Sequence, residues 1–135
     1  MPESAPSPFS YAILRVVPRV ERGERFNAGV VLFCRQRDFL GVKVGLDERR
    51  LAALAPDISP EEVDAHLDAL VRVAVGGPEG GAIGELPPSE RFGWLVAPSS
   101  TIVQPSEVHT GLSCDPAATL DQLYAELVEP PVPAR

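Results

Sequence analysis

Cysteine, histidine and lysine are scarce in this chain of 135 residues, and their scarcity narrows the chemistry that we expect. The two cysteines, Cys34 and Cys114, form no CxxC pair, and His66 and His109 lie far apart in the sequence. Metal sites and redox motifs need such residues at short, regular spacings. We therefore expect two reduced thiols, no metal site and no cofactor.

Long hydrophobic runs are missing as well. The most apolar stretches, such as AGVVLFC at 28–34, are far too short to cross a bilayer. The first ten residues, MPESAPSPFS, lack the basic and apolar regions of a secretory signal. We expect a cytoplasmic location without membrane association. Apolar residues still make up 44% of the chain, which is enough to build an independent core.

Positive charge is concentrated in the first part of the chain, which holds nine of the 12 basic residues, and Lys43 is the sole lysine among them. Residues 11–50 carry a net charge of +4, whereas residues 51–135 carry −10, and the whole chain carries −7. Affinity for nucleic acid needs a concentrated positive surface, and stacking on bases needs aromatic residues, which are only 6% here. Nucleic-acid binding is therefore not expected.

Proline and glycine mark the two ends and one internal boundary. We expect mobile tails at 1–8 and 129–135, with a single globular domain over 9–128. The stretch VGGPEGGAIGELPPS, residues 75–89, is predicted to be a linker within that domain. It lacks the Lys-Ser/Thr of a phosphate-binding loop and does not follow a strand, so it does not indicate a nucleotide site.

The first 46 residues predict three strands, at 9–17, 26–34 and 39–46. The first two are apolar on both faces, as in a central strand, and the third alternates apolar and other residues. The four-residue connection at 35–38 indicates a hairpin, so the three strands form an antiparallel meander. A fourth strand is expected at 100–104.

The remaining patterns are helical. Asp47 and Ser59 are predicted N-caps, with Pro60 and Glu62 completing the start of a helix that ends at Gly76. A short helix is favoured over 88–95, and a last helix opens at 115–116 and ends before Pro130. We therefore predict an α+β fold: an antiparallel sheet of three to four strands with helices packed mainly on one face.

The stretch VPRVERGERFNAGVVLF, residues 17–33, is the centre of the basic region, and it leads from one buried strand into the next. Arg15, on the strand before it, needs a partner because an unpaired buried charge is costly. Glu21 or Glu24 could supply that partner through a salt bridge, or Arg15 could bind an anionic group. Gly23 marks a turn with positive φ, and the Asn27-Ala28-Gly29 triplet indicates the close approach of a backbone or a ligand.

A second polar stretch, SERFGWLVAPSSTIVQPSEVHTG, covers residues 89–111. Its His109 could serve a hydrolase only beside a serine and an acid, and no G-x-S-x-G motif is present, so nucleophilic catalysis is not expected. From both stretches we take no catalytic residue and six candidate binding residues: Arg15, Arg22, Glu24, Asn27, Arg91 and Gln104.

With both stretches in view, the chain resembles an uncharacterised bacterial family known as domain of unknown function 3037. The similarity runs from about residue 9 to 128 and is most specific in the Arg-Gly-Glu-x-x-Asn-x-Gly motif at 22–29. The residues that match the family pattern are Arg15, Pro18, Arg22, Gly23, Glu24, Asn27, Gly29, Arg91 and Gln104. The resemblance implies no activity, and it suggests an accessory role because such genes often neighbour those of HipA-like kinases.

Two functions remain open. The first is a non-enzymatic interaction module that binds a protein partner, such as a HipA-like kinase. The binding surface would be the Arg-rich loop, residues 18–25, and the neighbouring strand edge. The acidic second part of the chain could also meet a basic partner. The alternative is a small enzyme or ligand-binding domain for an anionic nucleotide or phosphoester, with the six candidate residues converging on one pocket.

Overall fold

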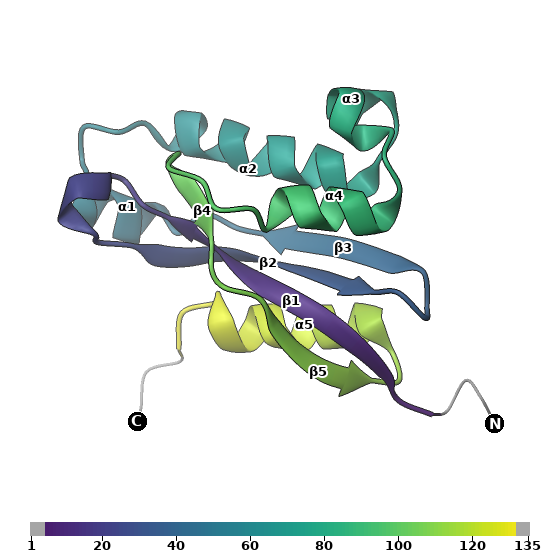
Figure 1. Cartoon of the computed structure of the whole chain (residues 1–135). Helices are drawn as coiled ribbons and strands as arrows, with labels where there is room; N and C mark the ends of the chain where they lie inside the picture. The colour runs from purple at the N-terminus through teal and green to yellow at the C-terminus, as the bar shows by residue number, and fades with distance from the viewer. Residues whose placement is uncertain (1–4, 132–135) are drawn as a thin grey trace.

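The computed structural model describes residues 5–131 and shows, within them, one antiparallel sheet of five strands (Figure 1). The strands are β1 (Ser7–Val16), β2 (Phe26–Cys34), β3 (Phe39–Val44), β4 (Val103–Pro105) and β5 (His109–Ser113). Their order is β3-β2-β1-β4, and β5 pairs with the first half of β1 while β4 pairs with its second half. The predicted meander of the first three strands is therefore confirmed.

Helices fill the connections. They are α1 (Glu48–Leu54), α2 (Pro60–Val75), α3 (Gly81–Gly84), α4 (Pro88–Leu95) and α5 (Pro116–Leu127), with short 3₁₀ helices at Val20–Arg22 and Pro78–Gly80. None of these helices, in the part of the chain that the structure describes, has the length and apolar character to cross a bilayer.

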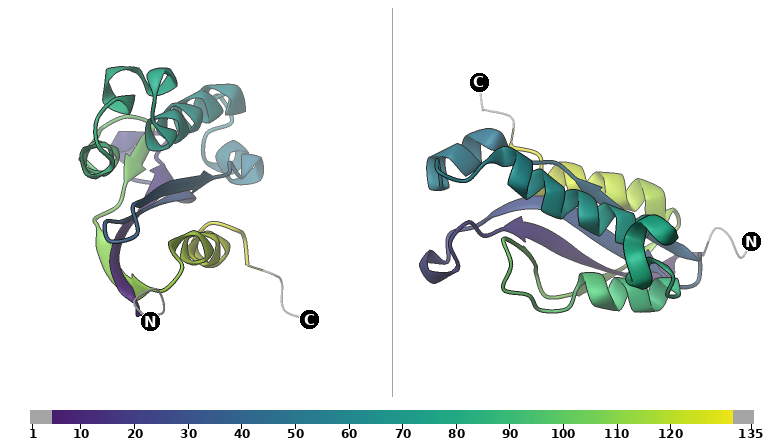
Figure 2. Two further views of the ribbon diagram at one scale, coloured as in Figure 1. Left: turned by 90° about the vertical axis from the view of Figure 1, so that its right-hand side faces the viewer. Right: turned by 90° about the horizontal axis from the view of Figure 1, so that it is seen from above.

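The helices cover the sheet unequally. Helices α2 and α4 lie over one face, and α5 lies alone on the opposite face (Figures 1 and 2). The larger core, between the sheet and α2 and α4, includes Leu14, Val31 and Leu67, and the smaller one beneath α5 includes Leu32 and Leu120. The predicted α+β class is confirmed, and the two-sided covering explains why β1 and β2 are apolar on both faces.

The helix starts follow the capping residues. Ser59 Oγ accepts a hydrogen bond from Glu62 N at 3.1 Å, and Asp47 accepts from Arg49 N and Arg50 N, both at 3.1 Å. At α5, Asp115 accepts from Ala118 N at 3.2 Å. Each side chain satisfies a backbone N–H that the first helical turn leaves unpaired, so local chemistry sets these three starts.

The Asn27-Ala28-Gly29 triplet marks an irregular point in the sheet. The register between β1 and β2 shifts at Leu14/Arg15, so that Gly29 pairs with Leu14 and Asn27 pairs with Arg15. A side chain on Gly29 would place its Cβ 2.9 Å from Lys43 O, so the close approach predicted here is that of the β3 backbone. Gly23, in the preceding loop, has the predicted positive φ of 71°.

The ends and the second half of the chain differ in detail from the prediction. Strand β1 begins at Ser7, inside the segment that we predict as a tail, and residues 1–4 and 132–135 lie outside the described residues. The predicted linker 75–89 holds a 3₁₀ turn and α3, closed by a 2.9 Å hydrogen bond from Gly77 N to Gly84 O. A single domain over 9–128 stays a prediction.

The fourth strand is shorter and later than predicted, at Val103–Pro105 in place of 100–104, and β5 is not anticipated by the sequence. The HTGLS stretch of β5 contains a glycine and two hydroxyl residues, and Leu112 is largely exposed. Its strand conformation comes from pairing with β1 rather than from a strong local pattern.

Candidate functional site

A cleft of about 330 Å³ lies between α2, the end of α4 and β4, on the side of the sheet that these helices cover. Leu14 is among its lining residues from β1, Leu70 and Ala69 line it from α2, and Trp94 lines it from α4. The segment at 97–99 after α4 completes the lining with small residues and a proline. The cleft is therefore mainly apolar, as ligand and anchor-residue pockets usually are.

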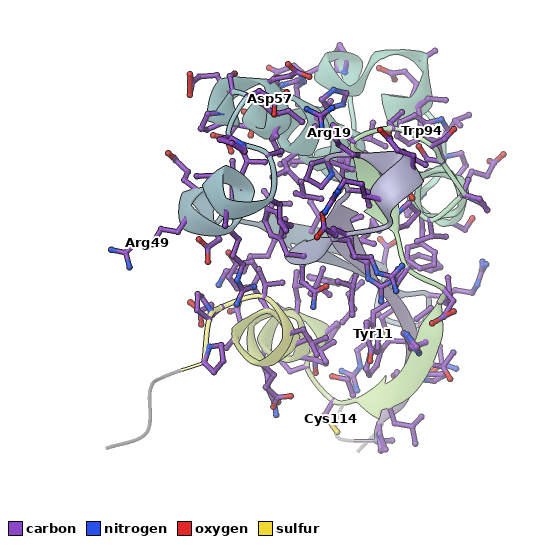
Figure 3. All side chains as sticks on the ribbon, turned by 90° about the vertical axis from the view of Figure 1, so that its left-hand side faces the viewer. Tyr11, Arg19, Arg49, Asp57, Trp94 and Cys114 are labelled. Atoms are coloured by element: carbon purple, nitrogen blue, oxygen red, sulfur yellow. The ribbon has the colours of Figure 1, made fainter. Side chains whose placement is uncertain are left out.

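Trp94 gives this cleft an exposed aromatic wall. It is the single tryptophan of the chain, and it is 46% exposed although it stands on a helix that packs against the core. Its neighbours Phe92 and Leu95 turn towards the core and are buried, which leaves Trp94 on the outer side of α4. Figure 3 shows Trp94 on the opposite side of the sheet from Tyr11.

The polar groups of the cleft are tied to one another and to the backbone. Ser99 Oγ and Thr101 Oγ1 share a hydrogen bond of 2.8 Å, and Thr101 Oγ1 donates to Val103 O at 2.8 Å. His66 is the sole titratable side chain among the described residues that line the cleft. One imidazole beside hydroxyls that are already bonded elsewhere forms no nucleophile–base pair.

The other hydrolase candidates are engaged elsewhere. His109 on β5 lies against the Tyr11 ring, with the ring centroids 5.3 Å apart and the planes tilted by 35°. Ser106 Oγ accepts from Ile13 N and donates to Glu107 O, both at 2.8 Å, and so anchors the turn after β4 to β1. Within residues 5–131 no three His, Cys, Asp or Glu side chains are grouped so that they could hold a metal ion.

Arg22 and Glu24 bind each other in the Arg-rich loop. Arg22 Nε donates to Glu24 Oε1 at 2.7 Å, and this hydrogen bond holds the pKa of Glu24 below its usual range. Arg19 pairs with Asp57, in the connection between α1 and α2 (Figure 3). Two of the loop's arginines are thus engaged within the chain, and the loop is fastened to the helical layer.

The Arg19–Asp57 pair gives a pH prediction. The hydrogen bond from Arg19 lowers the pKa of Asp57, so ionised Asp57 stabilises the folded state above the ordinary carboxyl pKa of about 4. That contribution is lost as pH falls through the lowered folded-state pKa. We expect Asp57→Asn to be slightly less stable than the native chain at pH 7 and to approach it at pH 3, as measured by urea unfolding. A difference that is the same at both pH values contradicts this expectation.

Arg15, Asn27 and Gln104 come together in one row of the sheet. Arg15 on β1 pairs in register with Asn27 on β2 and with Gln104 on β4. Asn27 Nδ2 donates to Leu127 O at the end of α5 at 2.8 Å, and Gln104 Nε2 donates to Thr101 O at 3.0 Å. The salt bridge suggested between Arg15 and Glu21 or Glu24 is absent among the described residues, because Glu24 binds Arg22 instead.

Arg91 lies in the helical layer, apart from that row. Its Nη1 donates to Val73 O at 3.1 Å and to Ala74 O at 2.6 Å, and its Nε donates to Leu86 O at 2.9 Å. These carbonyls belong to the last turn of α2 and to the segment before α4, so Arg91 joins three pieces of backbone. The structure thus brings Arg15, Asn27 and Gln104 together, pairs Arg22 with Glu24, and uses Arg91 in helix packing.

The cleft residues are the ones that sequence reasoning passed over. Trp94 is visible in the sequence as the lone tryptophan, but α4 is only 8 residues long, and its pattern does not say which side faces the core. Ala69 and Leu70 belong to the apolar side of α2, where core residues and cleft residues look alike. The signal available in the sequence is the lone tryptophan followed by the Ala-Pro-Ser-Ser segment at 97–100.

Comparison with known proteins gives one match. The model of the family described as "Protein of unknown function (DUF3037)" matches residues 11–128, which confirms the resemblance noted from the two motifs. No curated protein and no solved structure matches the chain. The matched region holds nearly all of the sheet, the cleft and the Arg-rich loop, and this chain therefore belongs to the DUF3037 family.

Proposed function

We propose that this protein is a non-enzymatic interaction module whose cleft binds an apolar side chain of a protein partner. The observation that carries the proposal is Trp94, 46% exposed on the wall of a mainly apolar cleft of about 330 Å³. Tryptophan is enriched among the residues that dominate protein–protein binding energy, and such residues gather around pockets that receive an anchor.

The partner is a positively charged segment. Helix α2, which forms one wall of the cleft, exposes four carboxylates and one arginine along its outer side. The carboxylates are those of Glu61, Glu62, Asp64 and Asp68, and the arginine is Arg72. Negative charge beside an apolar pocket favours a partner that offers an apolar anchor flanked by lysine or arginine.

The proposal moves the binding surface from the Arg-rich loop to the cleft. Arg19 and Arg22 each form an ion pair with a carboxylate of the chain itself. The cleft, in contrast, is open, so its apolar lining can contact a partner. A HipA-like kinase, suggested by the family resemblance, is one such partner, and its binding is expected to weaken in the same cleft variant as peptide binding.

Trp94 provides the assay, because its fluorescence reports on the cleft alone in a chain with one tryptophan. We expect a subset of peptides with a central Leu, Ile or Phe flanked by Lys and Arg, and without tryptophan, to shift the Trp94 emission on titration. Peptides of the same apolar sequence flanked by Asp and Glu serve as the comparison, at matched ionic strength.

Ala69→Arg is the diagnostic variant. Ala69 lines the cleft from α2, so an arginine there fills the opening and repels a basic partner, and affinity is expected to fall at least about tenfold. Ala65→Arg is the matched control, since Ala65 is exposed on the same helix and does not line the cleft. Equal losses in the two variants, or equal binding of the basic and acidic peptides, would overturn the proposal.

A further inference from the structure

We propose that a second site, lined by residues other than those of the cleft, binds a small oxyanion between the start of β2 and α1. A hollow of about 490 Å³ lies between the start of β2 and α1. Its lining residues are Arg25, Phe26, Asn27, Arg50, Ala53 and Leu54. None of them lines the cleft, so this proposal stands or falls separately from the protein-binding function.

Two arginines from different elements line this hollow. Arg25 is the residue immediately before β2, and Arg50 is on α1, 25 positions later in the sequence. Guanidinium groups present several N–H donors in a plane and match the oxygens of phosphate or carboxylate groups. Two of them on one concave surface are a suitable receptor for an anion that carries two or more negative charges.

Arg50 is held in place by the cap of its own helix. Asp47 accepts backbone hydrogen bonds from Arg49 N and Arg50 N, and its second oxygen lies 3.4 Å from Arg50 Nε. A contact at Nε leaves the two terminal Nη groups of Arg50 as donors. The carboxylate thus positions the guanidinium at the hollow, and it also neutralises part of its charge.

Arg25 supplies the uncompensated charge. In residues 5–131 its side chain makes no hydrogen bond or ion pair, because the neighbouring Glu24 is occupied by Arg22. The pairing of Arg22 with Glu24 therefore has a consequence for the hollow: it removes the nearest carboxylate that could neutralise Arg25. An exposed arginine that forms no ion pair within the protein has no such pair to break when it binds an anion from solution.

The floor of the hollow is apolar. Phe26 is buried, and Ala53 and Leu54 form the wall on α1. This apolar side offers the anion no hydrogen bond, so its recognition rests on the two arginines. Asn27 Nδ2 is already donating to Leu127 O, so we assign the anion to the two arginines and not to this amide.

The test is a calorimetric titration of the full chain with pyrophosphate, and with succinate in a second arm, at constant ionic strength. We expect pyrophosphate to bind, and Arg25→Gln and Arg50→Gln each to weaken it at least about fivefold. Succinate separates the two sources of the anion: tighter binding of succinate than of pyrophosphate indicates a carboxylate ligand, and tighter binding of pyrophosphate indicates a phosphate ligand.

Arg49→Gln is the matched control. Arg49 is adjacent to Arg50 on α1, but Figure 3 shows its side chain directed away from the body of the protein, and it does not line the hollow. Its substitution removes the same charge and is expected to leave affinity within about twofold. Arg25→Gln breaks no hydrogen bond or ion pair of the described residues, so we expect the variant to fold, which thermal unfolding without ligand verifies.

Three results would overturn this site. One is equal weakening by all three variants, which indicates general attraction to the basic region. Another is unchanged binding in Arg25→Gln and Arg50→Gln. The last is no heat of binding with either anion at concentrations up to about 10 mM, which would place any affinity below the weakest specific range. None of these three results bears on peptide binding at the cleft. A failure of peptide binding at the cleft likewise does not bear on the anion site.

Discussion

Leu14→Ala is expected to lower the free energy of unfolding by about 3 kcal/mol, which is a large fraction of the stability of a domain of this size. Leu14 has no exposed surface and stands on the central strand β1, paired with Gly29 on β2 and with Pro105 on β4. Removing most of its side chain loses buried apolar contacts and leaves a cavity that rigid strands on both sides cannot close.

Urea unfolding at pH 7 measures this effect, and thermal unfolding is expected to show a decrease in Tm of about 10 °C. Leu112→Ala is the control, because Leu112 is 68% exposed on β5 and its truncation is expected to cost less than about 0.5 kcal/mol. A loss below about 1 kcal/mol for Leu14→Ala would mean that β1 is not the tightly packed centre of the sheet.

Leu14 also lines the cleft, which gives the same variant a second readout. The alanine deepens an apolar opening by removing atoms from its wall, and apolar cavities of such a kind accept small hydrophobic molecules. We expect indole or benzene to stabilise Leu14→Ala more than the native chain in thermal unfolding.

Arg91→Ala is expected to lower the free energy of unfolding by about 3 kcal/mol as well, although Arg91 is not a core residue. Its guanidinium donates to Val73 O, Ala74 O and Leu86 O, at distances from 2.6 to 3.1 Å. Hydrogen bonds that involve a charged group are stronger than neutral ones, and truncation leaves partly buried carbonyls without a donor. The positive charge also sits favourably at the C-terminal end of α2.

The matched comparison is Arg72→Ala. Arg72 lies on the exposed side of α2 near the same helix end, and no hydrogen bond or ion pair of its side chain is present in the described residues, so little change is expected. Arg91→Lys should recover only part of the loss, since a single ammonium cannot reach three carbonyls in the geometry of a guanidinium. A fully stable Arg91→Ala would return this residue to the candidate ligand-binding set.

Arg91→Ala also separates a structural role from a binding role at one of the predicted binding residues. Arg91→Ala is expected to weaken folding and to leave the affinity of the folded protein for pyrophosphate unchanged, since Arg91 does not line the hollow. An arginine that holds backbone together and one that awaits an anion have the same letter in the sequence. Their partners distinguish them, and for Arg91 those partners are 5 to 18 positions away.

Much of the fold follows from local sequence. The helix starts at Asp47, Ser59 and Asp115 depend on side chains within three residues of the N–H groups that they cap, so a short window of sequence contains the whole cause. The hairpin of β2 and β3 is equally local, because a four-residue connection leaves few alternatives to antiparallel pairing.

A short window of sequence does not predict strand β5 or the folded segment at 75–89. The β5 residues are held by pairing with Ser7–Tyr11, about one hundred positions earlier, and their own pattern is too mixed to predict a strand. The glycine-rich segment looks flexible by composition, yet its backbone groups bond to one another and it packs on α2.

The candidate sites show the same division. The sequence by itself determined that the net charge changes from positive to negative after residue 50 and that the fold is α+β. It also determined that a charged loop within residues 15–29 connects two buried strands. Only the tertiary structure decided that Arg22 occupies Glu24, that Arg91 ties helices, and that Trp94 and Arg25 remain available. The reason is physical: a side chain's partner is whatever distant element folding brings within reach, and charge or aromaticity alone does not specify it.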